Sequence, residues 1–262
     1  MNLLPFNIDQ IEYFLLIFTR IITIIALLPV FGAQQVPLQI KVGLSLLLSL
    51  ILFTTVMKNT PPFQHTFSIA TFSLLVIKEV MVGLMIGFLA STLFVAVQFA
   101  GRLIDTEMGF GFVELADPFT DEPTTVLGQL QVILFTILFL SFNGHYFLLL
   151  AIQRCFELVP LTMIHFQEGK IATHITGLIG NLFLVALKFA APVYVTLFLT
   201  ELALGVVART VPQMNIFFVG MPLKIAIGLG TTILVLPMLG TLFKGVYEKL
   251  VQDIWRLLFL LT

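Results

Sequence analysis

Six stretches of about twenty or more mostly apolar residues run through the sequence, and they limit the possible folds more than any other feature. A transmembrane helix needs about 20 such residues, because the bilayer's hydrocarbon core is about 30 Å thick and each helical residue rises about 1.5 Å. The alternation of apolar and polar residues that marks a membrane β-barrel does not accompany them. The pattern therefore predicts an all-α, polytopic integral membrane protein. The six long hydrophobic helices are expected at residues 11–30, 38–57, 69–100, 126–150, 176–200 and 216–240.

Composition supports a membrane environment. Hydrophobic residues make up 59% of the 262 residues, charged residues 10%, and the mean hydropathy is +1.09. A chain with so few charges cannot cover its surface in water. The 13 basic residues are scattered and the net charge is −1, which argues against binding to nucleic acid. No hydrophilic or low-complexity linker divides the sequence, so we expect one domain over residues 1–262.

Two apolar stretches are too long for one straight crossing. Residues 69–100 would form a helix of roughly 48 Å. The charge-free run from residue 123 to residue 153 is similarly long, and Asn143-Gly144 predicts a break within it. At the C-terminus, apolar residues recur every three to four positions in 241–262 with charged residues between them, which predicts an amphipathic helix.

Several charged residues lie in or near the apolar stretches: Arg20, Lys41, Lys78, Glu79, Lys188, Glu201 and Lys224. A charge that faces lipid near the bilayer centre costs about 2.5–3.5 kcal/mol on the insertion scale, so we expect these residues to be paired, turned toward protein or in contact with water. Lys78 and Glu79 are adjacent and point about 100° apart on a helix, so at least one should find a partner elsewhere. A proton or ion relay is a rival explanation, but Glu79 and Glu201 are the only candidate acids.

A small-residue motif, Gly83-x-x-x-Gly87, lies on the third apolar stretch. Small residues four apart allow two membrane helices to approach closely, although glycine is common in such helices generally. The motif predicts a site of helix packing.

Residues 101–125 form the most unusual segment between two apolar stretches. One basic residue, Arg102, accompanies six acidic residues: Asp105, Glu107, Glu114, Asp117, Asp121 and Glu122. Glycines alternate with bulky apolar residues at Met108, Gly109, Phe110, Gly111 and Phe112. Two interpretations remain open. The segment either folds onto its own helix bundle or forms an apolar constriction that closes a pore and moves aside, since apolar constrictions can gate by excluding water.

Sparse motifs in a fixed order make the chain resemble the FliR family over nearly its full length. The first are Phe18-Thr19-Arg20, Leu28-Pro29-Val30-Phe31-Gly32 and Val36-Pro37. Next come Gly109-Phe110-Gly111, Asp117-Pro118 and Asn143-Gly144-His145, where the family often has Asp-Gly-His. The most specific are Ala208-Arg209, Val211-Pro212-Gln213-Met214-Asn215 and Gly220-Met221-Pro222-Leu223-Lys224.

The resemblance implies a non-catalytic core subunit of the flagellar type III protein export gate, without cofactor or metal. It implies assembly with FliP and FliQ homologues and association with FlhB, in the bacterial inner membrane at the flagellar basal body, with exported flagellar proteins as transient cargo. The N-terminal part is expected to be FliP-like and the last hairpin FliQ-like. The resemblance favours a pore plug at residues 108–112 and implies contacts to FliQ or FlhB through Lys188, Glu201, Arg209 and Lys224.

Two other functions remain open. An equivalent subunit of a virulence injectisome would share the same motifs. A small-solute transporter would show internal repeats with paired broken helices, and no convincing inverted repeat is present. An enzyme is disfavoured, because the sequence has no recognisable nucleophile–base pair, metal-spaced cluster or phosphate-binding glycine loop.

Overall fold

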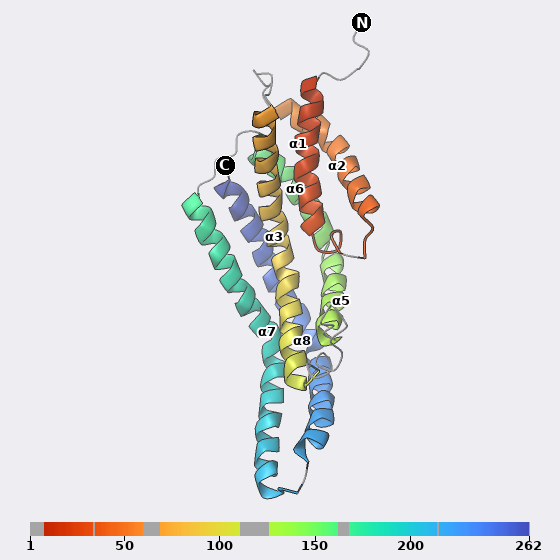
Figure 1. Ribbon diagram of the computed structural model, residues 1–262, viewed down its shortest axis with the longest axis vertical. Coiled ribbons are helices and arrows are strands. Elements are labelled where there is room, and N and C mark those ends of the chain that lie inside the picture. Colours follow the sequence, from red (N-terminus) through yellow and green to blue (C-terminus); the bar gives the residue numbers. More distant parts are fainter. Residues whose placement is uncertain are drawn as a thin grey trace. The chain divides into compact units, whose positions relative to one another are not determined.

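The fold is known from a computed structural model that describes residues 8–33, 35–59, 69–110, 126–161, 168–213 and 215–261. Within these residues all regular secondary structure is helical, as predicted. The helices in chain order are α1 (Ile8–Leu27), α2 (Leu38–Asn59), α3 (Ile69–Met108), α5 (Val126–Ser141), α6 (Gly144–Leu158), α7 (Glu168–Thr210) and α8 (Ile216–Leu260) (Figure 1).

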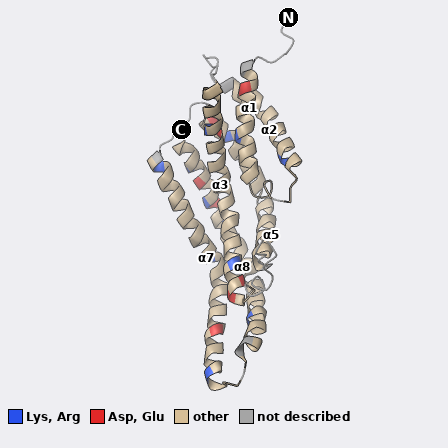
Figure 2. Ribbon diagram, viewed as in Figure 1, with Lys and Arg blue, Asp and Glu red and all other residues tan. Residues whose placement is uncertain are grey.

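The helices are those of a polytopic membrane protein. Five of the described helices, α1, α2, α3, α7 and α8, are long and apolar enough to cross a membrane, and α5 with α6 makes a sixth if they count as one broken span. Charged residues are sparse along the ribbon (Figure 2). The prediction of about six long hydrophobic helices is confirmed.

The interruption between α5 and α6 falls at the predicted Asn-Gly pair. α5 ends at Ser141 and α6 begins at Gly144. Between them, Asn143 adopts a left-handed conformation with φ 56°, which asparagine tolerates better than most residues. The carbonyl of Asn143 accepts a hydrogen bond from the amide of Phe147 at 3.1 Å, so the new helix starts immediately after the break.

The last two helices are longer than predicted. α7 has 43 residues and α8 has 45, against expected spans of 25 residues each. The C-terminal segment is not a separate helix, because α8 continues without a break through residue 260. Its amphipathic pattern is nevertheless present: Phe243, Ile254 and Leu258 are fully buried, whereas Lys244 and Arg256 are exposed.

Prolines do not end these two helices. Pro192 lies inside α7, and Pro222 and Pro237 lie inside α8. In apolar surroundings, neighbouring helices and hydroxyl side chains can satisfy the backbone groups that a proline frees. The carbonyl that Pro192 deprives of its amide partner is that of Lys188, four residues earlier, and α7 nevertheless continues to Thr210. The three prolines therefore leave α7 and α8 unbroken.

The chain divides into two compact units. The first comprises residues 1–92, 143–178 and 249–262, and the second comprises residues 93–142 and 179–248. The long helices α3, α7 and α8 contribute to both. The expectation of one domain over the whole chain stays a prediction.

In the first unit, α1 packs against α2 and against the first part of α3. Phe14 and Phe53 meet edge to face, with ring centroids 6.0 Å apart. A Cβ atom at Gly83 would lie 2.7 Å from Cβ of Thr23, and one at Gly87 would lie 2.6 Å from Cβ of Leu27. Because α1 faces both glycines so closely, side chains at these positions would push the two helices apart.

In the second unit, aromatic rings form the core between α3, α5, α7 and α8. Phe135 on α5 is at the centre, with its ring centroid 5.4 Å from that of Phe94, 5.8 Å from that of Phe189 and 4.5 Å from that of Phe243. All three contacts are edge to face, the arrangement that the ring quadrupoles favour. Beside this core lies an apolar cavity of about 320 Å³, which Val97, Gln131, Phe189 and Pro237 help to line.

In the second unit, α3 and α5 approach each other closely at Gly101. A Cβ atom there would collide with the backbone of Gly128. Gly101→Ala is therefore expected to force the two helices apart and to lower the free energy of unfolding by about 1–3 kcal/mol or more. Thermal unfolding of the detergent-solubilised chain measures this loss.

The matched control is Gly180→Ala on α7, where a Cβ atom would meet nothing within 4 Å. There the change should be neutral or slightly stabilising, since alanine is the better helix former by about 1 kcal/mol. Equal effects of the two substitutions would contradict the close approach at Gly101.

Candidate functional site

The predicted gate segment begins where α3 ends, and the structure shows why the helix ends there. Gly109 has φ 93°, a left-handed conformation that glycine adopts without strain. The amide of Phe110 donates to the carbonyl of Asp105 at 3.0 Å, and the amide of Gly109 donates to that of Thr106 at 3.2 Å. These two bonds form a Schellman motif, the glycine-based ending of many helices. Gly109 therefore has a structural role in fixing the direction in which the chain leaves α3.

The side chain of Asp105 attaches this end of α3 to the start of α5. Its carboxylate accepts hydrogen bonds from the amides of Leu127 at 3.1 Å and Gly128 at 3.2 Å. The first amides of a helix lack partners within the helix and carry partial positive charge, so a carboxylate is a favourable acceptor there. Asp105 is 2% exposed, and these bonds satisfy it inside the second unit. The two ends of the 109–125 segment are thereby held together.

Met108 holds the end of α3 against α8. Its side chain is fully buried. The sulfur and terminal methyl of Met108 lie against Gly228 on α8, where a Cβ atom would come within 2.8 Å of both. The absence of a side chain at Gly228 thus provides the space that Met108 fills.

Three charged residues lie near this anchor on three helices. Lys224 on α8 forms an ion pair with Glu201 on α7, with Nζ and Oε2 3.1 Å apart. Glu107 on α3 interacts electrostatically with both Glu201 and Lys224. Glu201 and Lys224, both expected to contact partner subunits, thus bind each other within the α7–α8 hairpin. We call Asp105, Glu107, Met108, Gly109 and Phe110, with their contacts on α5, α7 and α8, the loop base.

The structure covers only part of the predicted plug. Met108 is buried and Gly109 and Phe110 are half-buried, whereas Gly111 and Phe112 lie outside the described residues. The choice between a packed loop and a pore plug therefore stays open. The loop base fixes the position at which the following segment leaves α3.

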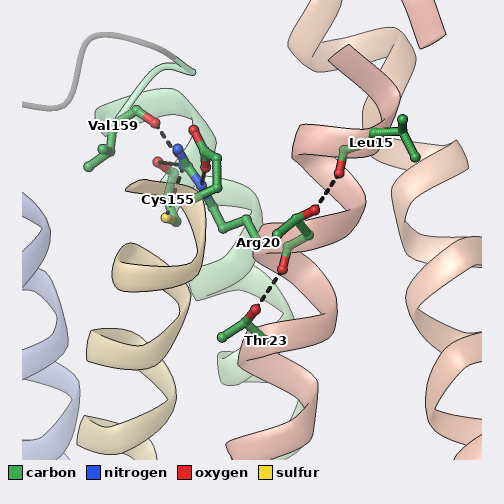
Figure 3. A network of polar contacts seen from close by, with 7 residues as sticks. Leu15, Arg20, Thr23, Cys155 and Val159 are labelled. Carbon is green, nitrogen blue, oxygen red and sulfur yellow. Dashed lines mark hydrogen bonds and ion pairs between the residues drawn. The ribbon is translucent and has the colours of Figure 1, made fainter. Parts of the chain in front are cut away.

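A second polar site lies in the first unit, around Arg20 of α1. Arg20 is fully buried and its Nε forms an ion pair with a carboxylate oxygen of Glu79 on α3. Its Nη1 donates to the carbonyl of Val159 at 2.8 Å, just beyond the end of α6, and lies 3.4 Å from the sulfur of Cys155 (Figure 3). The guanidinium also lies over the ring of Phe156, 4.5 Å from its centroid. We call these five residues the Arg20 cluster.

The Arg20 cluster joins three helices through one side chain. The carbonyl groups that end α6 carry partial negative charge, so the guanidinium is a favourable neighbour there. Two buried atoms, Nη2 of Arg20 and Oε1 of Glu79, have no protein partner among the described residues. The arrangement fixes α1, α3 and α6 together. The adjacency of Lys78 and Glu79 predicted that at least one of them has a partner elsewhere in the protein, but no local pattern identified Arg20 as that partner.

The other charged residues singled out in the sequence are less buried than Arg20 and Glu79. Lys78 is half-buried, and Lys188 and Arg209 are exposed. None of the three makes an ion pair with another residue in the described ranges. Gly83 and Gly87 lie against α1, as described above. Across the described residues, no three histidine, cysteine or acidic side chains gather in a way that could hold a metal ion.

Comparison with known proteins places these sites in a family. The profile of "Bacterial export proteins, family 1" matches residues 11–250. The chain is 35% identical to the flagellar biosynthetic protein FliR of Bacillus subtilis (strain 168), over 96% of each chain. It is 30% identical to the FliR of Pectobacterium carotovorum subsp. carotovorum, over 97% of this chain and 99% of that one.

The FliR of Escherichia coli (strain K12) is 27% identical over 88% of this chain. The matched region contains both the Arg20 cluster and the loop base. Since the family profile and relatives at 30% identity or more both extend over nearly the whole chain, this protein belongs to the FliR family of bacterial export proteins.

Proposed function

We propose that this chain is a non-catalytic core subunit of the flagellar type III protein export gate, which assembles with FliP and FliQ homologues and associates with FlhB. In this proposal it lies in the bacterial inner membrane at the flagellar basal body, and flagellar proteins pass the gate as transient cargo. Two kinds of support exist: the names of the relatives, each a flagellar biosynthetic protein FliR, and the surface and loop base of this chain.

The observation that carries the proposal is the apolar surface left uncovered by the chain itself. Only 11% of the most apolar window of α8 is buried, against 50% for α3. Ile233 and Leu234 on α8 are 67% and 80% exposed. At roughly 67 Å, α8 is also about twice as long as the hydrocarbon core is thick. Lipid alone cannot cover such a helix, so partner subunits are the expected cover.

We assign the gate role to the segment that follows the loop base in the sequence. Met108, Gly109 and Asp105 fix the point and direction of departure, through burial, the Schellman motif and the bonds to α5. The following residues alternate glycine, the least restricted residue, with phenylalanine, a bulky apolar one. An apolar segment on a fixed base suits a plug that closes a pore and yields to cargo.

Removing the gene from its own bacterium tests the function directly. We expect flagellar rod, hook and filament proteins to remain in the cytoplasm, and secretion to return when the chain is supplied from a plasmid. Immunoblots of culture supernatant and cell fractions measure this. Normal flagellar secretion together with loss of another secreted set of effector proteins would move the assignment to an injectisome. Normal secretion of all proteins would reject the proposal.

A further inference from the structure

One face of α7 is buried, and the opposite face is exposed. One face is buried: Ala186, Ala190, Val193, Leu197 and Leu204. Exposed residues stand two positions before each of these: Leu184, Lys188, Ala191, Val195 and Leu202. Successive residues of a helix are about 100° apart, so a shift of two positions leads to the opposite side. We call these exposed residues, with Phe198, the outer stripe.

The spacing of the outer stripe fits a second helix. Its members are separated alternately by four and three residues, which is the alternation of a heptad repeat. This is the seam spacing at which two helices pack side by side at a crossing angle of about 20°. Leu184, Val195, Phe198 and Leu202 are 58%, 53%, 49% and 53% exposed. The stripe is therefore an uncovered seam of one helix.

The length of α7 indicates that protein covers this seam. A helix of 43 residues is roughly 65 Å long, about twice the thickness of the hydrocarbon core. If the core includes Lys188, an unpaired ammonium group faces lipid, which is unfavourable. If the core lies on the C-terminal side of Lys188, Leu184 stands outside it, and if the core lies on the N-terminal side, the four members from Ala191 to Leu202 stand in water. Neither position leaves the whole stripe suitably solvated without a partner.

The charge on the stripe specifies the chemistry of that partner. Lys188 makes no ion pair with any described residue. On its own helix, the nearest Asp, Glu, Lys or Arg residues are Lys170 and Glu201, 18 and 13 residues away, or roughly 27 and 20 Å along the axis. An ammonium group inside an apolar seam is stabilised by a carboxylate directly opposite.

We propose that the outer stripe of α7 binds one apolar helix of another subunit, which carries an aspartate or glutamate opposite Lys188. This inference rests on the proposed function, because it specifies one contact within the proposed assembly. The carboxylate supplies the charge that the chain lacks at this position, and the apolar positions on either side exclude water from the ion pair. Lys188 thereby selects and aligns the partner helix, since only one axial position brings the two charges together.

Photo-crosslinking in the native membrane tests the contact. The photoreactive residue benzoylphenylalanine replaces Val195 on the stripe, in the complete chain expressed in its own bacterium. The control position is Tyr194, which is 39% exposed and lies about 120° around the helix from Lys188. We expect position 195 to give one dominant protein adduct that position 194 does not give. Mass spectrometry of the adduct identifies the partner peptide and its acidic residue.

Charge variants then test the ion pair. Lys188→Glu should reduce the adduct at position 195 by at least about tenfold, whereas Lys188→Arg should retain it. Exchanging the partner's acidic residue for lysine should restore the adduct in the Lys188→Glu chain. The amount of chain in the membrane is measured for each variant, so that loss of the chain is not mistaken for loss of the contact.

Three results would overturn the inference: adducts only to lipid, adducts between copies of this chain, or a Lys188→Glu chain that crosslinks normally. The gene-deletion experiment separates this inference from the proposed function. If deletion abolishes flagellar secretion while position 195 labels only lipid, the contact is wrong and the function stands. If a partner adduct forms but secretion never required the chain, the function is wrong and the contact stands.

Discussion

Replacing Arg20 alone by methionine is expected to lower the free energy of unfolding by about 3–5 kcal/mol, because it leaves the carboxylate of Glu79 buried without a counter-charge. Glu79 is fully buried and its other oxygen already lacks a partner among the described residues. Since a whole domain is stable by only about 5–15 kcal/mol, most of the variant chain should be degraded. The amount of chain in the membrane and its unfolding midpoint in mild detergent measure the effect.

Removing both charges together should be far less harmful. In the double variant Arg20→Met, Glu79→Leu, no charge remains buried, and such replacements are often neutral or better. The carbonyl of Val159 loses its 2.8 Å donor, which leaves a cost of about 1–3 kcal/mol. We therefore expect the double variant to recover most of the stability that the single variant loses.

An exposed ion pair on α6 provides the control. Nη1 of Arg154 and Oε2 of Glu157 are 2.8 Å apart, and the two side chains are 54% and 32% exposed. Arg154→Met should change stability by less than about 1 kcal/mol, because water already screens this pair. A similar loss from Arg154→Met and Arg20→Met, or a double variant as unstable as the single one, would contradict the Arg20 cluster as the junction of α1, α3 and α6.

Deleting residues 108–112 is expected to leave the chain in its complex but to make the gate leak ions and small molecules. The physical reason is the loss of the apolar groups that exclude water from the proposed constriction. The deletion also removes Met108, the buried contact of Gly228, and Gly109, the ending of α3. The deletion therefore damages the loop base as well as removing the rings.

A sharper variant removes only the two rings and keeps the rest of the loop base. Phe110→Ser with Phe112→Ser retains Met108 and Gly109, so α3 should still end normally. It should leak as the deletion does, which we would measure as dye entry and loss of membrane potential in cells that express the variant. The matched control is Met108→Ala, which damages the buried anchor but leaves both rings. A normally assembled complex that shows no leak with either plug variant would reject the plug.

The sequence predicted the helical class and several boundaries because those features are local. Asn143-Gly144 marked the interruption between α5 and α6, and Asn143 has a positive φ at that interruption. The end of α8 was predicted as a separate amphipathic helix, although its pattern of buried and exposed residues was correct. Charged residues reappear after residue 240, which suggested a boundary there, but the helix continues through Pro237 and Gly240.

The contacts of the candidate sites could not be predicted in the same way. Arg20 and Glu79 are 59 residues apart, and nothing in the local pattern of either helix indicates which charges meet. Glu201 and Lys224 pair with each other across the α7–α8 hairpin, and their expected contacts to other subunits stay a prediction. Conversely, the exposure of Lys188 could not be read from its apolar neighbours, because periodicity locates the faces of a helix without saying which face is covered.

Co-purification tests the central claim most directly. The chain is tagged in its own bacterium, extracted from membranes in mild detergent with its neighbours, and the mass and composition of the particle are determined. The account predicts one large particle of defined mass that contains this chain together with the FliP and FliQ homologues. A stable monomer or homodimer, with neither homologue bound, would contradict it and would favour the transport of a small solute.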